Sequence, residues 1–122
     1  EAEAAVDAAL RLRERLRPYL QRCLEQSHAS GLPVQRAMAL ACPGERAAWA
    51  FENQFFCGDD LLVAPCLQPG GEVEVYLPAG RWRRFPDGRE ELEGGRRLRL
   101  SLALAETAVF ARAGADIPLR AA

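Results

Sequence analysis

The spacing of apolar residues changes near residue 60, from helical periodicity before it to strict alternation after it. Between Ala2 and Ser27 the chain is rich in strong helix formers, and apolar side chains recur every three to four residues, which predicts an amphipathic helix. Pro18 lies inside this segment without the backbone N–H that a helix interior uses, so we expect a kink or a break there. Gly31 and Pro33 predict the end of the helix.

Two further elements are predicted before residue 60. Val34 to Leu40 is a short apolar run after a helix stop, which is typical of a buried strand in a parallel sheet. Glu45 to Phe56 carries apolar residues towards one side and predicts a short helix, and Gly58-Asp59-Asp60 predicts a turn. A helix, one strand and a short helix bury little surface, and the strand has no partner in that segment. This imbalance indicates that the chain is a piece of something larger.

After residue 60 the pattern predicts about five short strands at roughly ten-residue spacing, which favours an antiparallel β-sandwich or partial barrel. The segments between them contain the usual turn residues, including Pro86-Asp87-Gly88 and Gly94-Gly95. The predicted fold class is therefore α+β. The predicted strands are Leu61 to Cys66, Val73 to Leu77, Arg81 to Phe85, Leu98 to Leu104 and Ala108 to Arg112.

Composition narrows the classes of function. The chain has 122 residues, 49% of them apolar, and a net charge of −1, which is the balance of a globular domain and provides no field that attracts nucleic acid. No apolar run approaches the roughly 20 residues of a membrane helix, so we expect neither nucleic acid nor a membrane as partner. All 16 basic residues are Arg, which excludes lysine Schiff-base and phosphate-loop chemistry. No signal peptide is visible, and we expect a cytoplasmic location.

Metal and cofactor sites are not predicted. The four cysteines lack zinc-ligand spacing, and His28 is the only histidine in the chain. Each cysteine lies in an apolar stretch, so we interpret them as small buried side chains rather than disulfides or reactive thiols, which favours a reducing compartment. The cysteines are Cys23, Cys42, Cys57 and Cys66.

Two pairs of carboxylates are candidates for acid/base groups. Glu72 and Glu74 share one strand face, but Arg97 and Arg99, or Arg81 and Arg83, explain them as partners on a solvated face. Asp59-Asp60 is explained by a turn with local hydrogen bonds, and neither pair has an evident reason for a shifted pKa. We therefore predict no catalytic residue in this chain.

Two aromatic residues are candidates for stacking on a sugar ring. Trp82 and Tyr76 lie on predicted strands, and an exposed aromatic face is a common sugar platform. The alternative is that these rings belong to the core of the sandwich, which is the more frequent situation for a strand Trp.

Several motifs, in order and at their usual spacing, resemble the C-terminal part of glycoside hydrolase family 31, the retaining α-glucosidases and α-xylosidases. Each is weak alone, but together they extend from about residue 10 to 118 and are specific. Arg36, at the end of one motif, is interpreted as a structural, ion-paired arginine. The motifs are Leu16-Arg17-Pro18-Tyr19-Leu20, Gly31-Leu32-Pro33-Val34-Gln35-Arg36, the signature from Asn53 to Pro65, Val75-Tyr76-Leu77-Pro78-Ala79-Gly80-Arg81-Trp82, and the segment from Val109 to Pro118.

The resemblance implies that residues 1–58 are the helix–strand–helix end of a (β/α)₈ catalytic barrel and that residues 59–122 are the proximal β-sandwich domain. The family's two catalytic aspartates lie on earlier barrel strands, so this chain should be inactive alone and should support the barrel and its active-site rim. The rest of the barrel is then its partner. The alternative is an independent carbohydrate-binding or protein-interaction module. We also expect self-association through the apolar positions Leu10, Leu16, Leu20 and Leu24 if nothing else covers them.

Overall fold

The computed structural model describes residues 2–85, 88–104 and 106–117, and these residues form an α+β structure, as predicted. A helix, a short strand and a second helix come first, and mostly antiparallel strands follow. The elements are α1 (Ala2–Ser30), β1 (Gln35–Ala37), α2 (Met38–Ala41), the 3₁₀ helix η1 (Arg46–Ala50), β2 (Phe55–Cys57), β3 (Leu61–Ala64), β4 (Glu72–Leu77), β5 (Arg81–Phe85), β6 (Glu91–Glu93), β7 (Arg96–Ser101) and β8 (Ala108–Arg112).

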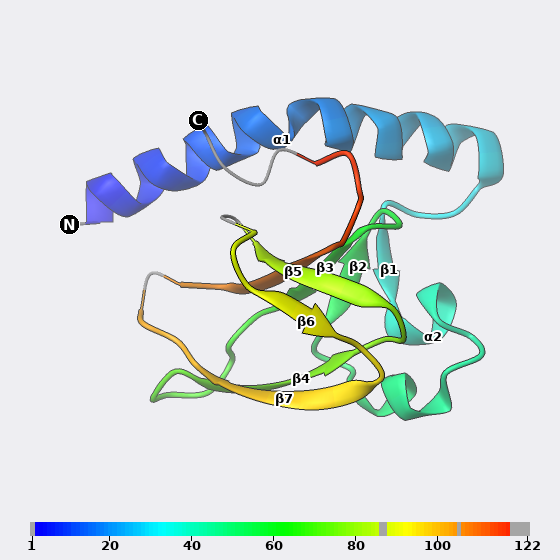
Figure 1. Ribbon diagram of the computed structural model, residues 1–122. Coiled ribbons are helices and arrows are strands. Elements are labelled where there is room, and N and C mark those ends of the chain that lie inside the picture. Colours follow the sequence, from blue (N-terminus) through cyan, green and yellow to red (C-terminus); the bar gives the residue numbers. More distant parts are fainter. Residues whose placement is uncertain (1, 86–87, 105, 118–122) are drawn as a thin grey trace.

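The elements form three layers (Figure 1). A six-stranded sheet in the order β1-β2-β3-β8-β5-β6 lies in the middle, and every pair in it is antiparallel. Helix α1 crosses one face of this sheet, and the two-stranded sheet β4-β7 covers the other. The N-terminal end of α1 extends beyond the edge of the sheet, where its side chains are exposed.

Two cores follow from the two-residue period of the strands. Alternate residues of the large sheet point towards β4 and β7, where Phe56, Leu62, Trp82 and Phe110 are fully or almost fully buried. The residues between them point towards α1 and form a second core. Its buried members are Tyr19, Cys23, Leu61, Phe85, Ala111 and Ile117.

Helix α1 continues without a break through Pro18, so of the predicted kink or break the break is wrong, and the kink stays a prediction. Pro18 is exposed, so the carbonyl that loses its helical bond is on the solvent side of the helix. Tyr19 and Cys23, immediately beyond it, are buried against the sheet and hold that part of the helix in place. Tertiary packing therefore outweighs the local cost of the proline.

The segment after α1 differs from the prediction in two places. The strand expected over Val34 to Leu40 is only three residues long, is antiparallel to β2, and continues directly into α2. Of the helix expected over Glu45 to Phe56, only η1 is helical. The end of that segment forms strand β2, which lies between β1 and β3. The ladder bonds available on both edges of β2 outweigh the helical spacing of its apolar residues.

All five strands predicted after residue 60 are present, but β3 ends at Ala64 rather than Cys66, and β7 is Arg96–Ser101 rather than Leu98 to Leu104. β5 and β8 have the predicted bounds, and Gly94 and Gly95 form the connection between β6 and β7. The prediction missed β6, a short edge strand with the sequence Glu-Leu-Glu. Pro86 and Asp87 of the predicted turn lie outside the described residues. Strands from both sides of residue 58 share the large sheet, and the predicted division there concerns a longer protein and stays a prediction.

Candidate functional site

The turn between β2 and β3 is bound tightly to α1. The Tyr19 hydroxyl donates to the Cys57 carbonyl at 2.6 Å and accepts from the Asp60 N–H at 3.1 Å. Burial raises the pKa of Tyr19 far above its usual range, so the phenol stays protonated. Gly58 lies between them with φ +69°, and a Cβ there would overlap the Tyr19 hydroxyl and the Cys23 sulfur. This position therefore requires glycine for both space and backbone conformation.

Arg36 and Asp59 join β1 to the same turn. The Arg36 side chain is 5% exposed, its Nε donates to the Pro33 carbonyl, and its Nη1 is 2.5 Å from Asp59 Oδ1. Gln26 of α1 donates to the other oxygen of Asp59 at 2.7 Å. The predicted ion-paired, structural role of Arg36 is confirmed, and one carboxylate connects a helix, a strand and a turn.

The two consecutive aspartates have opposite pKa shifts. Hydrogen bonds from Gln26 and Arg36 hold the pKa of Asp59 below its usual range. Burial, followed by the neighbouring Asp59 charge, raises the pKa of Asp60, while Arg112 opposes this rise. The expectation that neither aspartate has a reason for a shifted pKa is wrong. The hydrogen bonds to Asp59 and the burial of Asp60 beside that charge explain both shifts without a reacting group.

Gln54 connects the large sheet to β4. Its side chain is buried, its Oε1 accepts from the Tyr76 N–H at 2.9 Å, and its Nε2 donates to the Tyr76 carbonyl at 2.8 Å. β7 pairs with one edge of β4. On the other edge, the Gln54 amide bonds to the backbone of Tyr76 as a residue of a neighbouring strand would. The sequence placed Gln54 in a motif but did not indicate this bonding, because a primary amide is common at exposed positions too.

Glu45 forms a second connection to β4. Its two carboxylate oxygens accept from the Tyr76 hydroxyl and from the Ala79 N–H, both at 2.9 Å. The hydrogen bond to Glu45 raises the pKa of Tyr76 above its usual value, so this hydroxyl remains a donor. Gln54 and Glu45 together fix the segment around η1 against the small sheet.

Both predicted sugar-stacking residues lie in the core. Trp82 is 0% exposed, its indole N–H donates to the Pro78 carbonyl at 2.8 Å, and Arg112 lies over its ring. Tyr76 is 8% exposed and packs against Phe51 with ring centroids 5.6 Å apart. A sugar platform needs an open ring face, so these positions favour the core interpretation that the sequence left open.

Of the two carboxylates on β4, Glu74 has the arginine partners expected for a solvated strand face. Glu74 lies 3.6 Å from the Arg97 guanidinium and 3.9 Å from that of Arg99, both on the paired strand β7. Glu72 is opposite Ser101 at the end of the ladder. This arrangement agrees with paired surface charges rather than with an acid and a nucleophile facing each other across a cleft.

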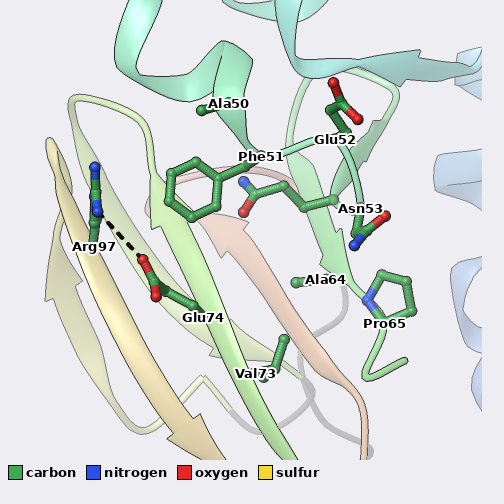
Figure 2. A pocket seen from close by; sticks show the side chains of 10 residues that line it. Ala50, Phe51, Glu52, Asn53, Ala64, Pro65, Val73, Glu74 and Arg97 are labelled. Carbon is green, nitrogen blue, oxygen red and sulfur yellow. Dashed lines mark ion pairs between the residues drawn. The ribbon is translucent and has the colours of Figure 1, made fainter. Parts of the chain in front are cut away.

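An open groove lies between the segment after η1 and strand β4 (Figure 2). Its volume is about 360 Å³, which is at the lower end of the roughly 300–1,000 Å³ typical of small-molecule sites. Ala64, Pro65 and Val73 supply apolar lining, Asn53 lies beside Pro65, and the Glu74–Arg97 ion pair lies on the other side of the groove. Sequence reasoning did not identify this groove, because its walls come from segments about 20 residues apart in the chain.

The described residues contain no cluster of three or more side chains suited to a metal ion. The four cysteines are free, and burial raises the pKa of Cys23, Cys42 and Cys57. These three thiols therefore resist ionisation, as expected for packed side chains. Within the described part of the chain, no helix has the length and apolar character needed to cross a membrane.

Comparison with known proteins agrees with the motifs. Residues 31–117 match the family model described as the Glycosyl hydrolase family 31 C-terminal domain, and the chain therefore belongs to this family. It is 32% identical over 112 residues to an alpha-xylosidase of Saccharolobus solfataricus and 39% identical over 80 residues to an alpha-glucosidase of Hordeum vulgare. These alignments cover 90% and 65% of this chain but only 15% and 9% of the relatives.

Solved structures show the same fold within longer chains. A GH31 dextranase from Flavobacterium johnsoniae, complexed with glucose, superimposes with a TM-score of 0.90 at 32% identity over 96% of this chain and 14% of the dextranase. A GH31 alpha-xylosidase from a soil metagenome, complexed with xylose, gives 0.87 at 36% identity over 93% of this chain and 17% of its own. The predicted family and the predicted C-terminal position within it are confirmed.

Proposed function

We propose that this chain is the non-catalytic C-terminal part of a retaining α-glycosidase, of the α-glucosidase or α-xylosidase type, and that it supports the catalytic barrel and the rim of its active site. The observation that carries the proposal is the match of nearly the whole chain, at a TM-score of 0.90, to a small part of a much longer glycosidase. The rest of the enzyme is its partner. Hydrolysis of O-glycosidic bonds then takes place on residues that the chain does not contain.

Apolar surface on α1 supports this arrangement. Val6, Leu10 and Leu24 are 56–60% exposed, whereas Tyr19 and Cys23 of the same helix are buried against the sheet. The helix therefore carries apolar residues on more of its circumference than the large sheet covers. Exposed apolar residues on the side of a helix that its own sheet does not cover are typical of an interaction site.

A second group of exposed apolar residues surrounds the outer edge of the large sheet. Leu32 precedes the short edge strand β1 and Leu40 follows it, and Trp49 lies on η1, the next helical element after α2. An open edge with apolar neighbours is suited to contact with another part of the enzyme. We infer that the barrel covers this edge and the free side of α1.

The test compares two proteins on aryl α-glucosides and aryl α-xylosides: the 122-residue chain and a longer polypeptide that includes the coding region upstream of residue 1. We expect hydrolysis by the longer polypeptide and none by the short chain, because the residues that the structure describes include no pair of carboxylates facing each other across a cleft. Hydrolysis by the short chain alone would contradict the proposal.

Self-association is a second proposal for the isolated chain. Leu10 and Leu24 remain more than half exposed, while Leu16 and Leu20 are partly buried against the sheet, so the expected contact shifts towards the exposed pair. Light scattering across a concentration series should show a dimer that weakens in the Leu10→Ser, Leu24→Ser double variant. A monomer at the highest concentration would contradict this proposal.

We further propose a cytoplasmic location, supported by the free state of Cys23, Cys42, Cys57 and Cys66. Fractionation of the native cells, followed by detection of the chain with an antibody, tests this. Recovery in the secreted fraction would contradict it.

A further inference from the structure

We propose that the groove of Figure 2 is a carbohydrate-binding site that takes the end of a neutral α-linked oligosaccharide. This inference rests on the proposed function for the class of ligand, because it adds an oligosaccharide contact outside the catalytic machinery. The groove, rather than the buried Trp82 and Tyr76, is then the place where a sugar contacts this chain.

The chemistry of the two walls suits a sugar ring. A hexose presents C–H groups on its faces and hydroxyl groups around its edge. Ala64, Pro65 and Val73 supply an apolar wall for the C–H face, and Phe51 closes the groove towards η1. Asn53, beside Pro65, supplies an amide, and Glu74, on the other side of the groove, supplies a carboxylate, so hydroxyl groups at the two edges of a sugar ring have a donor or an acceptor to bond to.

The side chains of Asn53 and Glu74 can form hydrogen bonds beyond those they already make. Asn53 is exposed, and no hydrogen bond of its side chain is found among the described residues. Glu74 is 42% exposed and is held by Arg97 at 3.6 Å and by Arg99 at 3.9 Å, distances longer than those of good charge-assisted hydrogen bonds. Both groups can therefore bond to a ligand without breaking a strong internal contact.

The charges at the groove favour a neutral ligand. Glu74 and Glu52 carry two negative charges, and Arg97 and Arg99 carry two positive charges. Arg97 is further occupied by the Phe51 ring, whose centroid is 5.7 Å from the guanidinium carbon. A phosphate or carboxylate would have to compete with Glu74 for these arginines, whereas a hydroxyl group can bond to either partner of the ion pair.

The groove is held in shape by the contacts described above. Gln54, the last residue of its η1-side wall, is fixed to the backbone of Tyr76 by two hydrogen bonds. Phe51 packs on the ring of Tyr76 from the same side. A preformed wall lowers the ordering cost of binding, although the open shape of the groove limits contact to one side of a sugar.

The experiment is an NMR titration of the 122-residue chain with isomaltotriose, followed by amide chemical shifts. We expect saturable shifts, with a millimolar Kd, limited to residues 51–54, 64–65, 73–74 and 97. Asn53→Ala removes a hydrogen bond to the ligand, and Glu74→Gln replaces a charged acceptor with a neutral one, so each should weaken binding at least about fivefold. Glu72→Gln is the matched control, because Glu72 lies two residues away on the same strand but does not line the groove.

Several outcomes would overturn the site. These are the absence of shifts at tens of millimolar isomaltotriose, shifts centred elsewhere, equal weakening by Glu72→Gln, and equal shifts with inorganic phosphate, which would indicate an anion site. Asn53→Ala keeps the test valid if Glu74→Gln alters the fold, because the side chain of Asn53 has no bond to lose within the described residues. None of these results affects the aryl-glycoside assay, so failure of this site and failure of the proposed function are distinguishable.

Discussion

The Gln54 side chain allows the sharpest test of how the two sheets are joined. In Gln54→Ala, the N–H and the carbonyl of Tyr76 lose their partners in a buried environment, where bonds of 2.9 and 2.8 Å hold them now. Each unsatisfied group costs about 1–3 kcal/mol, and water that enters the space recovers part of this. We expect a loss of about 2–4 kcal/mol, a large share of the roughly 5–15 kcal/mol of a typical domain.

A second substitution at the same position separates hydrogen bonding from packing. Glutamate has the shape of glutamine and can accept from the Tyr76 N–H, but its ionised carboxylate faces the Tyr76 carbonyl and cannot donate to it. Burial and this carbonyl raise the folded-state pKa of the new carboxyl above its unfolded value of about 4.3. Stability of Gln54→Glu relative to wild type is therefore greatest below about pH 4.3 and falls as the pH rises through the folded-state pKa.

Urea denaturation followed by tryptophan fluorescence measures both effects, since Trp82 is fully buried in the core between the sheets. For a chain of this length, each kcal/mol corresponds to about 4 °C in Tm, so Gln54→Ala should melt about 8–16 °C below wild type. Asn53→Ala, at the exposed neighbouring position, should stay within about 0.5 kcal/mol of wild type. A Gln54→Ala protein as stable as Asn53→Ala, or a Gln54→Glu protein with no pH dependence relative to wild type, would refute this reasoning.

Three further predictions concern the turn between β2 and β3. Gly58→Ala should lose at least about 2 kcal/mol of unfolding free energy, because the new methyl group overlaps Cys23 and Tyr19 at a positive φ. Gly44→Ala, with open space and an ordinary φ, should be near neutral, and equal thermal stability of the two variants would contradict this prediction. Tyr19→Phe should cost about 1–3 kcal/mol in urea denaturation, since the Asp60 N–H and the Cys57 carbonyl both lose a partner, and an unchanged midpoint would show that water replaces the hydroxyl. Asp59→Asn should cost only about 1 kcal/mol of unfolding free energy, because this carboxylate is 55% exposed and screened. Since the folded-state pKa of Asp59 is lowered, the wild type loses its extra stability over Asp59→Asn as the pH falls below about 3.8. A stability difference that persists in acid would contradict this prediction.

Local sequence chemistry was sufficient for the elements whose ends carry turn residues. β5 and β8 were predicted with their bounds, because Pro78-Ala79-Gly80 precedes β5 and Ala113-Gly114 follows β8. The end of α1 near Gly31 was also predicted, and Gly31 adopts φ +79° with its N–H bonded to the Ser27 carbonyl. In these segments the local preference and the tertiary structure agree.

Predictions failed where long-range pairing determines the structure. The segment from Glu45 to Phe56 has apolar residues at helical spacing. Its end nevertheless forms strand β2, because β1 and β3 pair with the two edges of this strand. β1 was expected in a parallel sheet, but it is antiparallel to β2, a relationship that its own residues do not encode. α1 remains continuous at Pro18 because the sheet holds the turn that follows.

The candidate sites show the same division. The pairing of Glu74 with Arg97 and Arg99 was among the predicted alternatives, since residues of facing strands can be aligned from sequence. The bonding of Gln54 and the groove beside it depend on contacts between segments about 20 residues apart, which no short motif specifies. The opposite pKa shifts of Asp59 and Asp60 arise likewise from Gln26, Arg36 and burial by distant residues.

The central claim, that this chain completes and stabilises a glycosidase without taking part in its chemistry, is tested most directly by reconstitution in trans. The upstream polypeptide without these 122 residues is expressed separately, and its hydrolysis of aryl α-glucosides and α-xylosides is measured with and without the added chain. We predict no hydrolysis by the chain, little by the upstream polypeptide, and a large, saturable increase when the two are mixed. Full activity of the upstream polypeptide on its own, or hydrolysis by the chain on its own, would contradict the account.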